Sequence, residues 1–175
     1  MLKSEYTFKV LCLMVLSNQL LADDKGLLAA KAAYEAKKWD ELSAAYQNKS
    51  PNDMWAAYID YYWLSSRIKE VDSIAIINFL QNYPSTWLTE QLRREWLLEL
   101  AERKDWPNYV QFYRGIVWPK VEHKCNYHIA LININDKSTV QAARQEFWLE
   151  DKKLPAVCDE LLTLLEKENL LNTQT

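Results

Sequence analysis

Glycine is almost missing from this 175-residue chain, which has two glycines and five prolines. Tight hairpin turns and phosphate-binding loops depend on glycine because it adopts positive φ without a steric penalty. The scarcity disfavours hairpin-rich β folds and excludes glycine-rich nucleotide motifs. Positive charge is not in excess either, since 21 basic and 24 acidic residues give a net charge of −3. We therefore expect no nucleic acid partner, because no basic stripe is present to attract one.

Histidine and cysteine are also scarce, with two and three residues respectively. A metal site needs several ligands at set spacings, whereas His123 and His128 are five positions apart and do not share a helical face. His128 lies on the same apolar stripe as Cys125 and Ile129, which favours a core histidine over a metal ligand. We expect no metal and no cofactor.

The first 22 residues have the pattern of a signal peptide. Lys3 and Lys9 precede an apolar run at positions 10–16, and cleavage is expected near Ala22. This run is shorter than the roughly 20 residues that cross a bilayer, so no membrane span is expected in the mature chain. We therefore predict an exported protein with one α-helical domain over residues 23–170 and a disordered tail at 171–175.

Apolar residues recur at i, i+3, i+4 and i+7 along the rest of the chain, which is the spacing of one face of an α-helix. No segment shows sustained period-two alternation. The pattern predicts eight or nine helices after the signal peptide. Short connections and wide aromatic stripes predict an all-α solenoid, a stack of antiparallel helical hairpins similar to tetratricopeptide repeats. Two clear stripes are Cys125, His128, Ile129 and Ile132, and Cys158, Leu161, Leu162 and Leu165.

Helix boundaries and an internal repeat agree with this fold. Ser50, Ser85 and Asp105 are suitable N-cap residues, and Ser50 is followed by a proline and an acid. Segment 33–46 can be aligned with segment 100–113, an offset of 67 residues, which is close to twice the roughly 34 residues of a two-helix repeat. Three prolines fall between stripes, where helices are expected to begin: Pro84, Pro119 and Pro155.

Six short fragments follow one another along the chain: Phe79–Pro84, Leu92–Leu97, Leu100–Trp106, Cys125–Tyr127, Phe147–Leu149 and Leu154–Asp159. Their order resembles the N-terminal U-shaped domain of soluble lytic murein transglycosylases, from about Leu28 to about Leu165. The resemblance implies a periplasmic superhelix of helical hairpins. In that family, a glutamate of a Glu-Ser motif in a C-terminal lysozyme-like domain cleaves the glycosidic bond, and no Glu-Ser dipeptide occurs here. We therefore expect no catalytic residue in this chain.

Cys125 and Cys158 remain after removal of the signal peptide. Cys125 is close in sequence to both histidines, so a cysteine nucleophile is one alternative. In an oxidising compartment, however, two cysteines more often cross-link. Each lies on the apolar stripe of its own helix, and one other helix separates the two. We predict a structural disulfide that closes a loop of roughly 33 residues and contributes about 3 kcal/mol.

Carboxylates and aromatic residues are the remaining candidates for function. Glu90 with Glu95, and Glu99 with Glu102, lie among arginines and lysines, so we interpret them as a solvated helix face. Most of the eight tryptophans share stripes with aliphatic residues, which favours core packing over stacking on sugars. Tyr61, Tyr62 and Trp63 span too wide an arc to be buried in one direction, so these three form the candidate surface for a partner or a glycan.

Three functions fit these observations. The first is a non-catalytic module for binding or scaffolding in peptidoglycan metabolism, with peptidoglycan or a periplasmic cell-wall protein as its partner. The second is a periplasmic adaptor of tetratricopeptide type that grips a peptide or protein. The third is part of an active transglycosylase whose catalytic domain is supplied separately. The fold is the same in all three, so it does not separate them.

Overall fold

The computed structural model describes residues 24–50, 54–136, 138–147 and 154–172. The predicted signal peptide lies outside these residues. The last helix continues to Asn172, which is two residues into the predicted tail, and residues 173–175 are not described. In the part of the chain that is described, no helix is long and apolar enough to cross a membrane.

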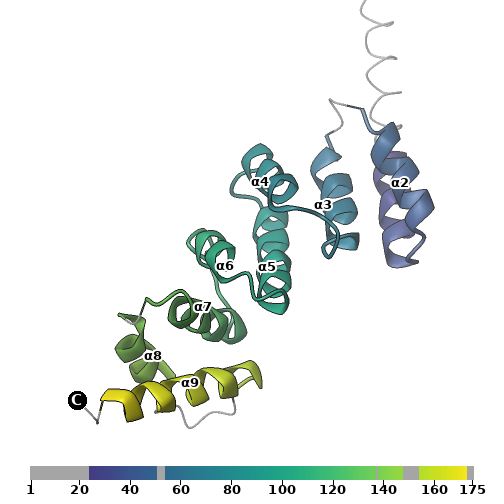
Figure 1. Cartoon of the computed structure of the whole chain (residues 1–175). Coiled ribbons are helices and arrows are strands. Elements are labelled where there is room, and N and C mark those ends of the chain that lie inside the picture. The colour runs from purple at the N-terminus through teal and green to yellow at the C-terminus, as the bar shows by residue number, and fades with distance from the viewer. Residues whose placement is uncertain (1–23, 51–53, 137, 148–153, 173–175) are drawn as a thin grey trace, which may run out of the picture. The chain divides into compact units, whose positions relative to one another are not determined.

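The described residues form nine helices and no strand, so the predicted all-α solenoid class is confirmed (Figure 1). Short connections join consecutive helices, as expected for helical hairpins. The first helix occupies residues 24–35. It is followed by α2 (Trp39–Asn48), α3 (Ala56–Ser66), α4 (Ser73–Asn82), α5 (Trp87–Glu102), α6 (Trp106–Tyr113), α7 (Val121–Asn133), α8 (Thr139–Phe147) and α9 (Val157–Asn172).

The helices fall into two compact units, Met1–Thr89 and Glu90–Thr175, called unit 1 and unit 2 below. The boundary lies inside α5. The predicted domain over residues 23–170 therefore contains parts of both units. That it unfolds as one cooperative domain stays a prediction.

In unit 1 the core joins the helix at 24–35 to α2 and α3. Ala30, Ala33, Leu42 and Ile59 are essentially inaccessible to solvent and pack together. The two alanines leave room for aromatic rings, and Tyr34 lies with its ring centroid 4.9 Å from that of Tyr62. Full burial of a side chain such as Ile59 stabilises the fold by about 1.5–3 kcal/mol.

The core of unit 2 is built around α7, which packs against α6, α8 and α9. The two predicted stripes, on α7 and α9, face each other across this core. Cys125 and Cys158 are fully buried there and form a disulfide with a Cα–Cα distance of 5.3 Å. The bond therefore joins next-but-one helices, as the stripes predict. Val140, Ala143 and Phe147 of α8 complete the cluster.

Three helices end in the same left-handed cap although glycine is absent from all three. Lys37, Lys104 and Asn135 have φ of 56°, 56° and 64°. Each is followed by an amide that donates to a carbonyl five residues back: Lys38 to Ala33, Asp105 to Leu100 and Asp136 to Leu131, all at 2.9 Å. This is the Schellman pattern, in which glycine is the usual left-handed residue. Lys37 and Lys104 are 67 residues apart, so the two aligned segments share this cap, and their origin as copies of one repeat stays a prediction.

Two of the three N-cap predictions can be compared with the structure. The Asp105 side chain accepts a hydrogen bond from the Asn108 amide at the start of α6, as predicted. The prediction for Ser85 is wrong, because the hydroxyl of Thr86 caps α5 by accepting from the Thr89 amide at 3.1 Å. Ser85 has a φ of 60° in the preceding turn. The capping pattern at Ser50 involves residues 51–53, which lie outside the described residues, and α3 begins at Ala56.

Candidate functional site

The predicted aromatic surface on α3 is mostly engaged inside unit 1. Tyr61 is buried, with its ring centroid 5.7 Å from that of Tyr62. Tyr62 is half-buried against the unit 1 core. Trp63 is half-buried, stacks on Tyr46 at 4.9 Å and carries the Arg67 guanidinium 4.7 Å from its ring centroid. A role of these three residues in binding a partner or glycan stays a prediction, and any exposed surface comes from Tyr62 and Trp63.

Unit 1 contains a half-open pocket of about 220 Å³. Below it is called the α3–α4 pocket, because α3 and α4 supply most of its lining. Leu64 and Phe79 are buried and form apolar parts of the lining. The full lining is Tyr46, Asp60, Leu64, Ala75, Asn78, Phe79, Asn82 and Tyr83.

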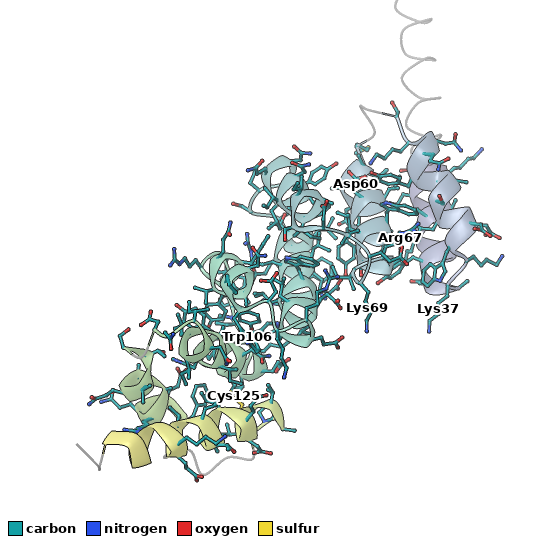
Figure 2. All side chains as sticks on the ribbon, viewed as in Figure 1. Lys37, Asp60, Arg67, Lys69, Trp106 and Cys125 are labelled. Carbon is teal, nitrogen blue, oxygen red and sulfur yellow. A yellow bond between two sulfur atoms is a disulfide. The ribbon has the colours of Figure 1, made fainter. Side chains whose placement is uncertain are left out.

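One wall of the α3–α4 pocket is a polar cluster around Asp60, which is labelled on α3 in Figure 2. The Tyr83 hydroxyl donates to Asp60 Oδ2 at 2.7 Å, and the Lys49 ammonium pairs with Asp60 Oδ1. The same ammonium lies 4.2 Å from the centroid of the Tyr46 ring. Both charged side chains are largely shielded, with 21% and 17% exposure for Lys49 and Asp60. The wall is therefore ordered and its charges are matched before any ligand arrives.

The acidic residues of α5 correct our interpretation of a solvated face. Glu90 and Glu99 have side chains that are 12% and 8% exposed, and each is paired within its own helix. Glu99 accepts from the Arg103 guanidinium at 2.7 Å. Of the four acids, only Glu102 lies on an exposed position of the helix. For Glu90 the error has a clear cause, because this carboxylate also accepts hydrogen bonds from amides far away in the sequence.

Glu90 clamps the loop between α6 and α7. Its Oε1 accepts from the amides of Val117 and Trp118 at 3.1 and 3.3 Å and from Arg94 Nη2 at 3.2 Å. Arg94 Nη2 also donates to the Trp118 carbonyl at 3.1 Å. The backbone on both sides of Trp118 is thus fixed by one ion pair, while the indole is 73% exposed and Val117 is 62% exposed.

Gly115, one of the two glycines, lies in the same loop beside the neighbouring arginine. A β-carbon at Gly115 would stand 2.6 Å from Arg93 Nη1. This guanidinium donates to the Phe112 carbonyl at 3.3 Å. Glycine therefore allows the guanidinium to approach the backbone at the end of α6.

The tryptophans divide between core and surface, which corrects our interpretation of general core packing. Trp96 is fully buried and Trp106 packs against the unit 2 core. Trp39, Trp87 and Trp118 are 46%, 68% and 73% exposed. Trp148 lies outside the described residues. Periodicity did not identify the exposed ones, because Trp39 and Trp87 each begin a helix and Trp118 lies in a loop.

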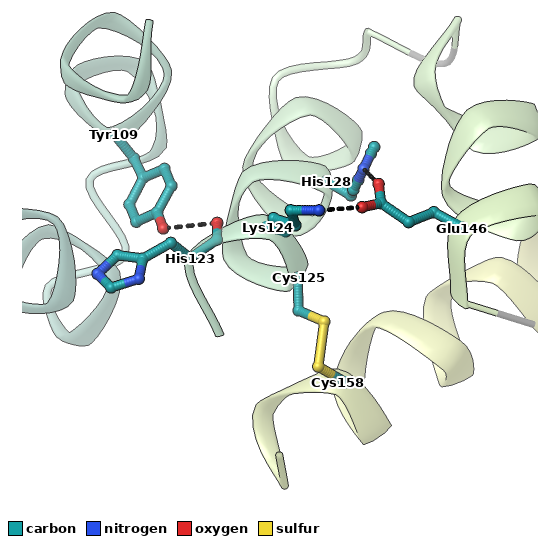
Figure 3. Close-up of a disulfide and its surroundings, with 7 residues drawn as sticks. All are labelled: Tyr109, His123, Lys124, Cys125, His128, Glu146 and Cys158. Atoms are coloured by element: carbon teal, nitrogen blue, oxygen red, sulfur yellow. Dashed lines mark hydrogen bonds and ion pairs between the residues drawn. A yellow bond between two sulfur atoms is a disulfide. The ribbon is translucent and has the colours of Figure 1, made fainter. Parts of the chain in front are cut away.

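Both histidines are buried in unit 2, so His128 has the predicted core position (Figure 3). His128 Nδ1 lies 2.5 Å from the Thr139 hydroxyl and Nε2 lies 3.5 Å from Glu146 Oε2. Lys124 Nζ pairs with Glu146 Oε1 at 2.7 Å. His123 packs beside Tyr109, whose hydroxyl donates to the His123 carbonyl at 2.9 Å.

His128, Thr139 and Glu146 are residue types that occur in catalytic sites, but their burial and pKa shifts do not suit catalysis. Thr139 is 7% exposed, so a substrate does not reach its hydroxyl. Burial raises the pKa of the Glu146 carboxyl, but Lys124 and His128 outweigh it and hold the pKa below its usual value. A general acid that protonates a sugar oxygen needs the opposite shift. Burial also lowers the pKa of His128, although Glu146 opposes the shift.

The residues suited to holding a metal do not converge within the described ranges. No group of three or more histidine, cysteine or acidic side chains there is arranged to hold a metal ion. Cys125 and Cys158 are bonded to each other, which removes the thiolate that a cysteine nucleophile needs.

Sequence and fold comparisons place this helical solenoid beside one group of enzymes. No family model matches the chain. It is 22% identical over 157 residues to the soluble lytic murein transglycosylase of Escherichia coli K12, covering 87% of this chain and 24% of that enzyme. The enzyme of the same name from Salmonella typhimurium is 24% identical over 107 residues, or 61% of this chain and 16% of that enzyme.

Solved structures give the same result. The crystal structure of the 70-kDa soluble lytic transglycosylase from Escherichia coli matches with a TM-score of 0.72 at 21% identity, covering 85% of this chain and 24% of that one. The complex of the 70-kDa enzyme with bulgecin A matches with a TM-score of 0.73. The resemblance to soluble lytic murein transglycosylases is confirmed in sequence and in fold. The chain spans about a quarter of the length of these relatives.

Proposed function

We propose that this chain is a non-catalytic periplasmic module that binds murein or organises murein-processing proteins. The observation that carries the proposal is the similarity, in sequence and fold, to part of enzymes named for their action on murein. The buried carboxylates support a binding role. Asp60, Glu90 and Glu99 are each paired with a lysine or arginine, so each carboxylate is already engaged within the protein rather than presented to a glycan.

Retention on purified murein sacculi tests the proposal. The protein is mixed with sacculi, sedimented and washed at two salt concentrations, so that weak charge-driven adsorption is removed. Retention that survives the higher salt is the expected result. Release of soluble muropeptides in the same assay would overturn the non-catalytic part, and complete loss from the pellet would overturn murein binding.

The fixed loop in unit 2 favours a second candidate, a periplasmic adaptor that docks an apolar protein surface. Val117 and Trp118 are exposed on a backbone held by Glu90 and Arg94, and such rigid aromatic groups are typical anchors of protein interfaces. Trp118→Ala should then abolish capture of a periplasmic protein that Trp87→Ala still captures. Trp87 is a matched control because it is 68% exposed. Equal capture by both variants would contradict this candidate.

A further inference from the structure

The α3–α4 pocket supports a more specific inference, because some of its polar side chains have hydrogen-bond partners within the protein and others do not. Asp60 and Tyr83 of the lining are hydrogen-bonded to each other, and Lys49 behind them pairs with Asp60. In contrast, the side-chain amides of Asn78 and Asn82 are exposed, and among the described residues they make no hydrogen bond. Among the described residues, the side-chain polar groups of the pocket that have no protein partner are thus the two amides and the Tyr46 hydroxyl.

These amides are placed together by the helix. Asn78 and Asn82 are four residues apart on α4, so they lie on one face about one turn apart. Each amide offers an N–H donor and a carbonyl acceptor. The complementary ligand group also has one donor and one acceptor close together, as a secondary amide does. Phe79 lies between the two asparagines in the sequence. Its side chain is buried and adds an apolar surface to the pocket.

The charge of the pocket argues against an ionic ligand. Asp60 is already matched by Lys49, and an inserted ion would lose its hydration without meeting a free counter-charge. A purely aliphatic group is disfavoured as well, because it would remove water from the two amides without replacing their hydrogen bonds. A neutral group that has an amide and a small apolar end meets both requirements.

The volume of the pocket limits the size of the ligand group that can enter it. At about 220 Å³ the pocket is smaller than the roughly 300–1,000 Å³ of sites for drug-sized ligands, so it admits one pendant group or a single ring. An acetamido group carries its amide and its methyl on one short branch, so both can enter the pocket together. A peptide main chain continues on both sides of each amide and needs an open groove instead.

We propose that the α3–α4 pocket binds the acetamido group of an N-acetylated amino sugar. Asn78 and Asn82 hydrogen-bond the amide, and the methyl group packs on Phe79 and Leu64. This inference rests on the proposed binding of murein, whose glycan strands carry acetamido groups, and it assigns the contact to unit 1. Tyr83 and Lys49 hold Asp60 in place beside them.

The test is a titration of the full protein with the tetramer of N-acetylglucosamine, followed by NMR of side-chain amides. We expect the Asn78 and Asn82 amide resonances to shift, and the fully deacetylated tetramer to leave them in place. The double variant Asn78→Asp with Asn82→Asp should weaken binding by about tenfold or more, because two hydrogen bonds lose their donors. Gln81→Glu adds the same kind of charge at an exposed neighbouring position and should bind as the unchanged protein does.

The outcomes separate this inference from the proposed function. Sacculi binding with no amide shift from the tetramer leaves the murein function standing and overturns the pocket assignment. Amide shifts without sacculi binding support the pocket and overturn the murein function. Equal binding of acetylated and deacetylated tetramers, unchanged binding by the double variant, or stronger binding of an alanine peptide would each overturn the acetamido assignment.

Discussion

Replacing the left-handed lysines with glycine should stabilise the protein. Lys37 and Lys104 hold φ of 56° in two Schellman caps. A left-handed conformation costs an L-residue about 1–2 kcal/mol, while glycine loses about 0.5–1 kcal/mol more backbone entropy on folding. The difference predicts a gain of about 0.5–1 kcal/mol for Lys37→Gly and for Lys104→Gly. Asparagine tolerates this conformation better, so Asn135→Gly should gain less.

Urea unfolding measures these gains, and alanine variants separate their cause. Lys37→Ala and Lys104→Ala remove the charge but keep the β-carbon, so they should leave the unfolding midpoint nearly unchanged. The glycine variants should raise it without changing the slope of free energy against urea. Amide hydrogen exchange assigns each gain to its unit, because Lys37 lies in unit 1 and Lys104 in unit 2. A glycine variant no more stable than its alanine counterpart would refute the reasoning.

Three further predictions concern unit 2. Cys125→Ala combined with Cys158→Ala should lower the free energy of unfolding by about 3 kcal/mol, because the disulfide closes a 33-residue loop. A loss below about 1 kcal/mol in urea unfolding would contradict this prediction. Glu90→Gln should weaken the hydrogen bonds that hold the loop between α6 and α7 and so lower the NMR order parameters of the backbone at 117–118. Glu102→Gln, at an exposed position of α5, is the control and should leave them unchanged. Burial lowers the pKa of His128, so the neutral imidazole stabilises the fold above pH 6.5 and this stabilisation is lost as the pH falls through the lowered pKa. His128→Gln should therefore flatten the decline in thermal stability between pH 7 and 5.

Regular helix faces were predictable from the sequence because their signal is local. The stripes on α7 and α9 repeat at helical spacing, so their burial and the Cys125–Cys158 pairing followed from periodicity and helix order. The Lys37 and Lys104 turns were also visible, as an alignment of two segments. The stripes and the turns depend on residues within one or two turns of a helix, and the order of the helices then indicated the cysteine pairing.

Contacts between distant segments were not predictable in this way. Glu90 looked solvated because the amides it binds are 27 and 28 residues further along the chain. The α3–α4 pocket was missed for the same reason, since Lys49 follows α2, Asp60 lies on α3 and Tyr83 follows α4. No single segment carries the pattern of the pocket. It exists only after three helices have packed.

The complete burial of Cys125 and Cys158 constrains the order of events during maturation. A disulfide is made or broken when a thiolate attacks a sulfur atom in line, which requires access to that atom. Once α7 and α9 have closed over the sulfurs, an oxidoreductase no longer reaches them. The cross-link must therefore form while this part of the chain is still open, and a mature molecule should keep it when external reductant is added without denaturant.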